Sequence, residues 1–95
     1  MSEEAEEWIV REWTLRHPKG LHARPASLLV KTTRAFQSEI QLLYNQQEAN
    51  CKSLFSLLTL CVTDGSQLHL RARGPDAGQA LEAVMRVLES PEFLG

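Results

Sequence analysis

Four residues near position 22 have types and a spacing that suit phosphate chemistry. Gly20 precedes His22 by two residues, and Arg24 and Pro25 follow shortly after it. Proline is tolerated only in the first turn of a helix, so Pro25 predicts a helix that begins at or just after His22. The free N–H groups and the dipole at such a helix end attract an anion and disfavour a protonated imidazole. A neutral His22 is a competent nucleophile, and the Arg24 guanidinium fits phosphate oxygens.

This local pattern has two interpretations. In the first, His22 attacks a phosphoryl group and holds it, while Gly20 lets the backbone come close and Arg24 stabilises the charge. In the second, His22 only caps a helix and Arg24 is a solvated cation, because short motifs often match by accident. The chain has no glycine-rich nucleotide cradle and no Walker-type lysine, so a nucleotide-using kinase is not predicted.

Hydrophobic periodicity predicts the elements that position this stretch. Alternation of apolar and polar residues indicates strands at 8–16, 39–44 and 67–73, and a short strand with a weaker pattern is predicted at 48–51. Apolar residues at helical spacing indicate helices at 23–35 and 77–88, and a good N-cap residue with no β-branched run after it indicates a helix at 54–60. Ser53 and Asp76 are the predicted N-caps of the second and third helices. In the third helix, Glu82 and Arg86 have the spacing of an ion pair.

The predicted order of elements is β-α-β-β-α-β-α. An amphipathic sheet and amphipathic helices imply two layers, with the helices packed on one face of an antiparallel sheet. The other face is predicted to meet water and to carry the polar strand residues Glu12, Thr14, Gln41, His69, Arg71 and Arg73. We therefore expect one α+β domain at residues 8–95, preceded by an acidic tail at residues 1–7.

Size and composition limit the possible functions. The chain has 95 residues, of which 43% are hydrophobic and 23% are charged, as expected for a soluble globular domain. A net charge of −2 gives no basic field for nucleic acid, and no stretch is apolar enough to span a membrane. Cys51 and Cys61 have neither disulfide-scaffold nor zinc spacing, and His17 and His69 are predicted to be solvated. We therefore expect reduced thiols, no metal, no cofactor and a cytoplasmic location.

Three motifs, in order along the chain, carry a family resemblance. Residues 20–26, Gly-Leu-His-Ala-Arg-Pro-Ala, resemble the active-site signature of HPr, the histidine phosphocarrier family of the bacterial phosphotransferase system. Residues 50–60 resemble the family's second signature, in which Ser53 stands 31 residues after His22 at the place of a regulatory serine. Residues 72–81 resemble its closing pattern. Three motifs at the family's spacing favour the phosphocarrier interpretation of His22 over the capping one.

The resemblance implies a fold, a site and partners. The family's fold is an open-faced β-sandwich, a four-stranded antiparallel sheet with three helices, which agrees with the predicted order. His22 would carry the phosphoryl group on Nδ1, and the residues that contact the group would be Gly20, Ala23, Arg24 and Pro25. Enzyme I would donate the group, with phosphoenolpyruvate as its ultimate source, and enzyme IIA domains of sugar transporters would accept it. The chain would be a monomeric carrier and not an enzyme.

The segment after Ser53 is apolar nearly all round, and a small domain cannot bury every face of a short helix. We therefore predict a partner-docking patch at Leu54, Phe55 and Leu58, with Phe55 the most exposed. The resemblance implies that Ser53 is the target of HPr kinase/phosphorylase in bacteria that have this enzyme. A phosphate there would add a charge of about −1.5 to −2 to a largely apolar docking surface.

Some positions depart from the family pattern. Residues 45–47, Asn-Gln-Gln, can form a turn, but they replace a turn that often contains glycine, so a glycine-based tight turn is not expected there. Ser56 and Cys61 stand where glycine is common. Residues 48–50 and 74–76 are also similar to the nitrogen-related branch, whose carriers regulate partner proteins, and this regulatory role is the alternative function. A single-strand RNA binder fits poorly, because the predicted open face offers no aromatic pair for base stacking.

Overall fold

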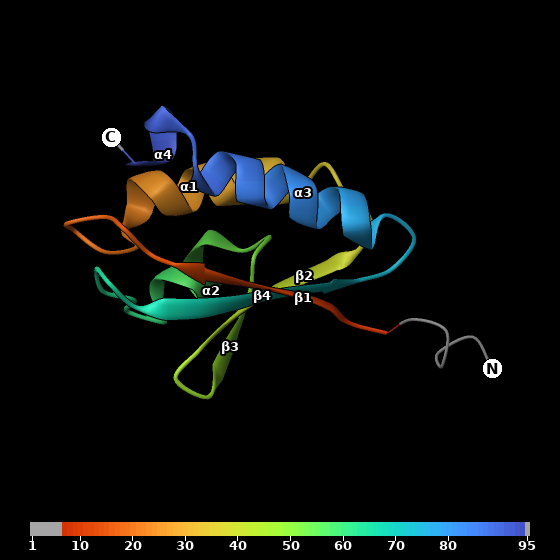
Figure 1. Cartoon of the computed structure of the whole chain (residues 1–95), viewed down its shortest axis with the longest axis horizontal. Helices are drawn as coiled ribbons and strands as arrows, with labels where there is room; N and C mark the ends of the chain where they lie inside the picture. The colour runs from red at the N-terminus through yellow and green to blue at the C-terminus, as the bar shows by residue number, and fades with distance from the viewer. Residues whose placement is uncertain (1–6, 95) are drawn as a thin grey trace.

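A four-stranded sheet carries the helices on one face in this computed structural model, which describes residues 7–94 (Figure 1). The strands are β1 (Ile9–Thr14), β2 (Glu39–Tyr44), β3 (Gln47–Asn50) and β4 (Gln67–Arg73). All neighbouring strands are antiparallel, in the order β1-β4-β2-β3. The predicted α+β class and open-faced sheet are therefore confirmed. The predicted acidic tail lies outside the described residues except for Glu7.

The two central strands, β2 and β4, span the predicted residues without a shift. In β4, Leu68, Leu70 and Ala72 are buried, while the residues between them are more exposed. Leu42 of β2 pairs with Leu70, so the apolar residues of both strands meet on the face that the helices cover. The edge strands differ slightly from the prediction, since β1 is shorter than residues 8–16 and β3 begins one residue earlier.

The helices are α1 (Ala23–Thr33), α2 (Leu54–Leu58), α3 (Ala77–Leu88) and α4 (Pro91–Leu94). α1 begins where predicted, directly after His22, and α3 has its predicted span. α1 and α2 each end two residues earlier than predicted. The sequence pattern did not predict α4. Pro91 follows the end of α3 and is the first residue of α4, a position that proline favours.

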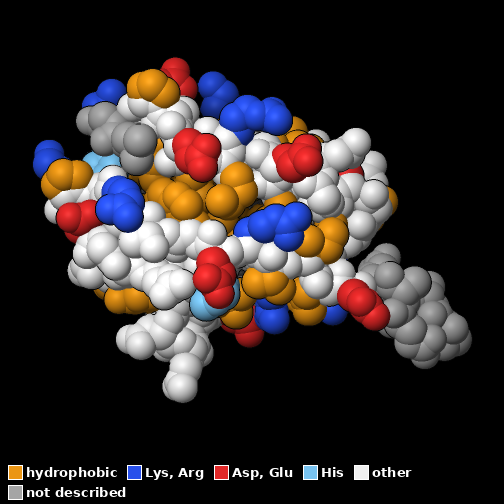
Figure 2. All heavy atoms as spheres, viewed as in Figure 1, with side chains coloured by type: hydrophobic (Ala, Val, Ile, Leu, Met, Phe, Trp, Pro, Cys, Tyr) orange, Lys and Arg blue, Asp and Glu red, His pale blue; other side chains and the backbone are white. Residues whose placement is uncertain are grey.

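The hydrophobic core lies between the sheet and the helical layer. Ala26 and Leu29 of α1 and Leu81 and Val84 of α3 are each at most 1% exposed. Figure 2 shows hydrophobic side chains in the seam between the helices and the sheet, with charged side chains on either side of it. Within residues 7–94, no helix has the length and hydropathy needed to cross a membrane.

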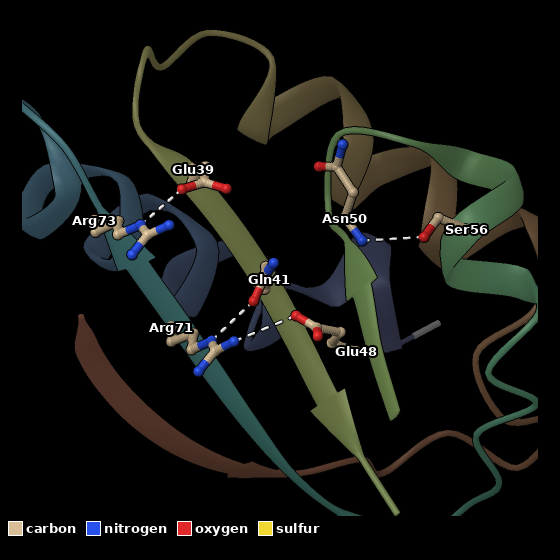
Figure 3. Close-up of polar contacts among 7 residues, drawn as sticks. All are labelled: Glu39, Gln41, Glu48, Asn50, Ser56, Arg71 and Arg73. Carbon is tan, nitrogen blue, oxygen red and sulfur yellow. Dashed lines mark hydrogen bonds and ion pairs between the residues drawn. The ribbon is translucent and has the colours of Figure 1, made fainter. Parts of the chain in front are cut away.

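The open face of the sheet carries polar contacts across β4, β2 and β3 (Figure 3). Arg73 donates a hydrogen bond to Glu39 at 2.7 Å. Arg71 donates to Gln41 at 2.8 Å and to Glu48 at 3.3 Å. Because these groups are partly solvated, each ion pair contributes at most about 1 kcal/mol, so the contacts align the strands more than they stabilise them.

Trp8 is an unpredicted member of this face. Its ring lies under the guanidinium groups of Arg71 and Arg73, whose central carbons are 4.0 and 4.3 Å from the ring centroid. At the neighbouring edge, His69 and Glu12 approach to 3.3 Å. The face is therefore polar, as predicted, with one aromatic ring covered by two cations.

The turn between β2 and β3 is tight although it contains no glycine. Tyr44 pairs with Gln47, so Asn45 and Gln46 alone form the loop. Both have positive φ, 57° and 67°, as a type I′ turn requires. Asparagine tolerates this conformation, whereas a Cβ at Gln46 crowds the backbone. The pairing of β2 with β3 therefore imposes the turn, in the absence of a glycine that would favour it.

At α3, the predicted N-cap position of Asp76 is confirmed, but the predicted ion pair of Glu82 and Arg86 is wrong. Asp76 stands at the N-cap position, but its carboxylate accepts hydrogen bonds from the hydroxyl and N–H of Ser38 and from the N–H of Gln37 instead of capping the helix. These bonds, led by that of the Ser38 hydroxyl, lower the pKa of Asp76. Glu82 and Arg86, both described and both exposed, form no ion pair, because solvation of such groups competes with a weak attraction.

We expect Asp76→Asn to lower the free energy of unfolding at neutral pH. Because the folded pKa is depressed, the carboxylate stabilises the fold above its unfolded pKa of about 3.9. That contribution is lost as the pH falls through the folded pKa. Urea denaturation should therefore show a difference between native and variant that is constant near neutral pH and shrinks below about pH 4. Glu82→Gln is the matched control, and a pH-independent effect of Asp76→Asn would contradict the assignment.

Cys51 and Cys61 are both free thiols in different settings. Burial raises the pKa of Cys51 to about 12. Cys61 is exposed and has a φ of 55°, a conformation that favours glycine. We expect Cys61→Gly to raise the free energy of unfolding by about 0.5–1 kcal/mol in urea denaturation, because glycine adopts positive φ without a steric cost. Cys61→Ser keeps the Cβ and should show no gain; equal stability of the two variants would refute this explanation.

Candidate functional site

The loop before α1 turns tightly at Gly20. Its φ is 71°, and a Cβ at this position would collide with the carbonyl oxygen of Val62. The same oxygen accepts a hydrogen bond from the N–H of Leu21 at 3.0 Å, and the N–H of Gly20 donates to His17 at 2.8 Å. The loop is therefore in close contact with the segment that follows α2, and this contact places His22 at the start of α1.

His22 is the N-cap residue of α1, as Pro25 predicts. Its carbonyl oxygen accepts the N–H of Ala26 at 3.0 Å, while its side chain makes no capping hydrogen bond. Because Pro25 has no N–H, the backbone donors without an intrahelical partner in the first turn are those of Ala23 and Arg24. The imidazole is thus not used as a cap, and the helix end offers its partial positive charge to an anion.

The two nitrogens of the half-buried His22 ring have different surroundings. Nε2 is buried and has no hydrogen-bond partner among the described residues. Nδ1 is not buried in this way, so it is the more accessible of the two nitrogens. Desolvation lowers the pKa of His22, and the charges of His17, Lys19 and Arg24 lower it further. The neutral ring, whose lone pair is nucleophilic, is favoured near neutral pH.

A pocket of about 190 Å³ opens beside His22, lined by His17, Lys19, Arg24, Glu92 and Phe93 among others. The prediction that His17 is solvated is wrong, since it is only 7% exposed. Its ring lies edge-on against His22, with centroids 4.9 Å apart, and against Phe93 at 6.3 Å. Local periodicity could not reveal this burial, because it depends on the contact with α4 at the other end of the chain.

The residues predicted to contact a phosphoryl group surround His22. Arg24 and Pro25 line the same pocket, and Ala23 and Arg24 present N–H groups at the helix start. Gly20 sets the conformation of the loop before α1 through its positive φ. Within the described part of the chain, no three His, Cys, Asp or Glu side chains are grouped to hold a metal ion.

Ser53 occupies the N-cap position of α2, as predicted. Its hydroxyl accepts a hydrogen bond from the N–H of Ser56 at 3.2 Å. The Ser56 hydroxyl in turn accepts the N–H of Asn50 at 3.0 Å, a contact visible in Figure 3. α2 is therefore fastened to the end of β3, and Ser53 has a structural role in the absence of any modification.

The predicted docking residues of α2 differ in how far their side chains are exposed to solvent. Phe55 is 79% exposed and Leu54 is 36% exposed, whereas Leu58 is half-buried against the core. A cleft between α1 and α2 is lined by Leu54 and Lys31, and a second cleft, between α1 and α4, shares Lys31 with it. The second cleft also shares Arg24 with the His22 pocket. A surface of apolar and cationic side chains therefore extends along α1 from His22 to α2.

Comparison with known proteins identifies the family. The family described as the PTS HPr component phosphorylation site matches residues 9–90. Phosphocarrier protein HPr from Buchnera aphidicola is 41% identical over 75 residues, which cover 79% of this chain and 88% of that protein. A histidine-containing phosphocarrier protein from Mycoplasma has a TM-score of 0.86 at 29% identity, covering 90% of this chain and 98% of that one. For HPr-C-His from Thermoanaerobacter tengcongensis the TM-score is 0.83 at 33% identity, with 90% and 94% covered. The chain belongs to the HPr family of phosphocarriers of the phosphotransferase system.

Proposed function

We propose that this phosphocarrier of the phosphotransferase system accepts and donates its phosphoryl group through Nδ1 of His22. The lone pair of neutral Nδ1 attacks phosphorus, the bond from phosphorus to the donor breaks, and Nε2 keeps its proton. The reverse step passes the group to the next protein. The observation that carries the proposal is the placement of His22 at the N-terminus of α1 with Nε2 buried.

The surroundings of His22 support transfer of an anionic group. The N–H groups of Ala23 and Arg24 and the helix dipole would stabilise charge on the phosphoryl oxygens. Arg24 lines the pocket and is exposed, and its guanidinium can form two parallel hydrogen bonds with such oxygens. Gly20 and Pro25 would contact the group through the loop and the first turn.

The partners that we propose are proteins. Enzyme I would donate the phosphoryl group and enzyme IIA domains of sugar transporters would accept it. Phe55 and Leu54 offer an exposed apolar patch, and the clefts along α1 connect this patch with the His22 pocket. The curated relatives named phosphocarrier protein HPr agree with the role in the phosphotransferase system, and none of them favours the regulatory, nitrogen-related role.

Phosphate uptake tests the proposal. Incubation with enzyme I and phosphoenolpyruvate should load one acid-labile, base-stable phosphate per chain, as expected for phosphohistidine. Addition of an enzyme IIA domain should then remove it. A chain that takes up no phosphate, or only acid-stable phosphate, would contradict the proposal.

Ser53 is a proposed regulatory site on the same surface. Its phosphorylation would add a charge of about −1.5 to −2 beside Leu54 and Phe55 and should weaken apolar docking. After treatment with HPr kinase/phosphorylase and ATP, we expect uptake from enzyme I to slow by at least about fivefold. Ser53→Ala should resist the kinase and keep its uptake rate, while Ser56→Ala is the control that leaves the target hydroxyl in place. No phosphate at Ser53, or an unchanged rate, would refute the regulatory role.

A further inference from the structure

His17 is a buried polar residue that the proposed transfer chemistry does not use. It lies in the wall of the His22 pocket, five residues before His22, and is only 7% exposed. Histidine is usually found at intermediate depth, so a nearly buried ring at the edge of a reactive pocket calls for a physical explanation.

Hydrogen bonds hold His17 at both the backbone and the ring. Its N–H donates to the carboxylate of Asp64 at 2.8 Å, and its carbonyl oxygen accepts the N–H of Gly20 at 2.8 Å. The ring atom Nδ1 accepts the N–H of Lys19 at 3.4 Å.

The other side of His17 is closed by aromatic rings from distant parts of the chain. Phe93 of α4 is fully buried and lies edge-on to His17, with centroids 6.3 Å apart. Trp13 of β1 packs edge-on against Phe93 at 5.6 Å. Such edge-to-face contacts have a preferred geometry, so they restrict the orientation of the His17 ring. The family match ends at residue 90, so α4 lies beyond the matched segment.

The fixed His17 ring meets His22 directly. The two centroids are 4.9 Å apart and the ring planes make an angle of 70°. Nε2 of His22 is buried and has no hydrogen-bond partner among the described residues. We propose that His17 is a positioning residue for phosphotransfer: held by Asp64 and Phe93, its ring fixes the orientation of the His22 imidazole and leaves Nδ1 toward the pocket. The inference rests on the proposed function, since it concerns the same nitrogen.

The proximity also has an electrostatic consequence. Desolvation is the largest cause of the lowered pKa of His22, and electrostatic repulsion from His17, Lys19 and Arg24 lowers this pKa further. Glu92 of α4 is the acidic residue among those that line the same pocket. Removal of His17 should therefore let His22 become protonated at a higher pH, and the acid limb of phosphate uptake should move in the same direction.

Two substitutions of His17 separate the effect of its aromatic ring from the effect of its charge. His17→Phe keeps a planar ring but cannot be protonated, and His17→Gln removes both. The matched control is His69→Gln, because His69 lies on the open face of the sheet and takes no part in the pocket. Titration of His22 by nuclear magnetic resonance and uptake of phosphate from enzyme I are measured from about pH 5 to pH 8, the range of histidine titration.

We expect His17→Gln to lower kcat for phosphate uptake by about 10- to 100-fold with little change in KM for enzyme I, because misorientation affects the reacting atoms and not docking. His17→Phe should recover most of this loss at the upper end of the pH range. Both variants should shift the His22 titration to higher pH, whereas His69→Gln should match the native chain. If His17→Gln does not fold, the His22 titration and the rate of phosphate uptake in His17→Phe still test the effect of the His17 charge.

Two outcomes would overturn the inference. One is an unchanged kcat and an unchanged His22 titration in both His17 variants. The other is a loss of kcat in His17→Gln that His17→Phe does not recover. Failure of the proposed function gives a different result, since the native chain would then take up no phosphate while the His22 titration could still be followed without any partner.

Discussion

Replacing His22 with glutamine should reduce the uptake of phosphate from enzyme I to background. Glutamine has a similar length and can still form hydrogen bonds, but its amide nitrogen has no available lone pair for attack on phosphorus. The fold should persist, because the His22 side chain makes no capping hydrogen bond and the N-cap carbonyl remains in place. Radiolabelled phosphoenolpyruvate with enzyme I measures the uptake, and circular dichroism checks the fold.

His69→Gln is the matched control for this loss. It removes one of the three histidines at a partly exposed position on the sheet, where the ring contacts Glu12, and it should load phosphate at the native rate. His17 should not substitute for His22, because its ring is nearly buried. Equal loading of the native chain and His22→Gln would place the phosphate elsewhere and refute the assignment.

Replacing Gly20 with alanine should damage both stability and transfer. The added Cβ would collide with the carbonyl oxygen of Val62, and alanine at a φ of 71° is strained whatever the space. Strain and overpacking together should lower the free energy of unfolding by about 2–4 kcal/mol. Relief of the collision must move the loop away from Val62, which breaks the hydrogen bond from Leu21 and displaces His22. We expect a fall in phosphate uptake of about 100-fold under conditions where the variant remains folded.

Gly65→Ala separates the backbone strain at positive φ from the collision with Val62. Gly65 also has a positive φ, 87°, but a Cβ there would meet nothing within 4 Å. It should therefore show only the backbone penalty, about 1–2 kcal/mol, and a native rate of phosphate uptake. Urea denaturation and the uptake assay measure both effects. Equal destabilisation by the two variants, or native uptake by Gly20→Ala, would show that the contact with Val62 does not position the loop.

The parts of the fold that follow from short-range physics could be predicted from the sequence. Alternation in residues 39–44 and 67–73 defined β2 and β4 to the residue, because both strands are central and bury one face. Pro25 located the start of α1, since proline cannot stand further inside a helix. Ser53 capped α2 as expected, and the excess of apolar residues in that short segment correctly indicated the exposure of Phe55.

The remaining features depend on contacts between segments that are distant in the chain. His17 is buried by Phe93 of α4, and the short segment that forms this helix has too few residues for a periodic pattern. Asp76 bonds with Ser38 instead of capping α3, because the fold brings the α1–β2 connection within reach. The Asn45–Gln46 turn is tight because strand pairing outweighs the local cost at Gln46.

The position of the phosphoryl group on the native protein tests the central claim most directly. After loading by enzyme I and phosphoenolpyruvate, proton–nitrogen correlation spectra distinguish the three histidine rings and the two nitrogens of each. We predict phosphorus coupling at Nδ1 of His22 and no coupling at either nitrogen of His17 or His69. Phosphate on Nε2 of His22, or on any other residue, would contradict the account.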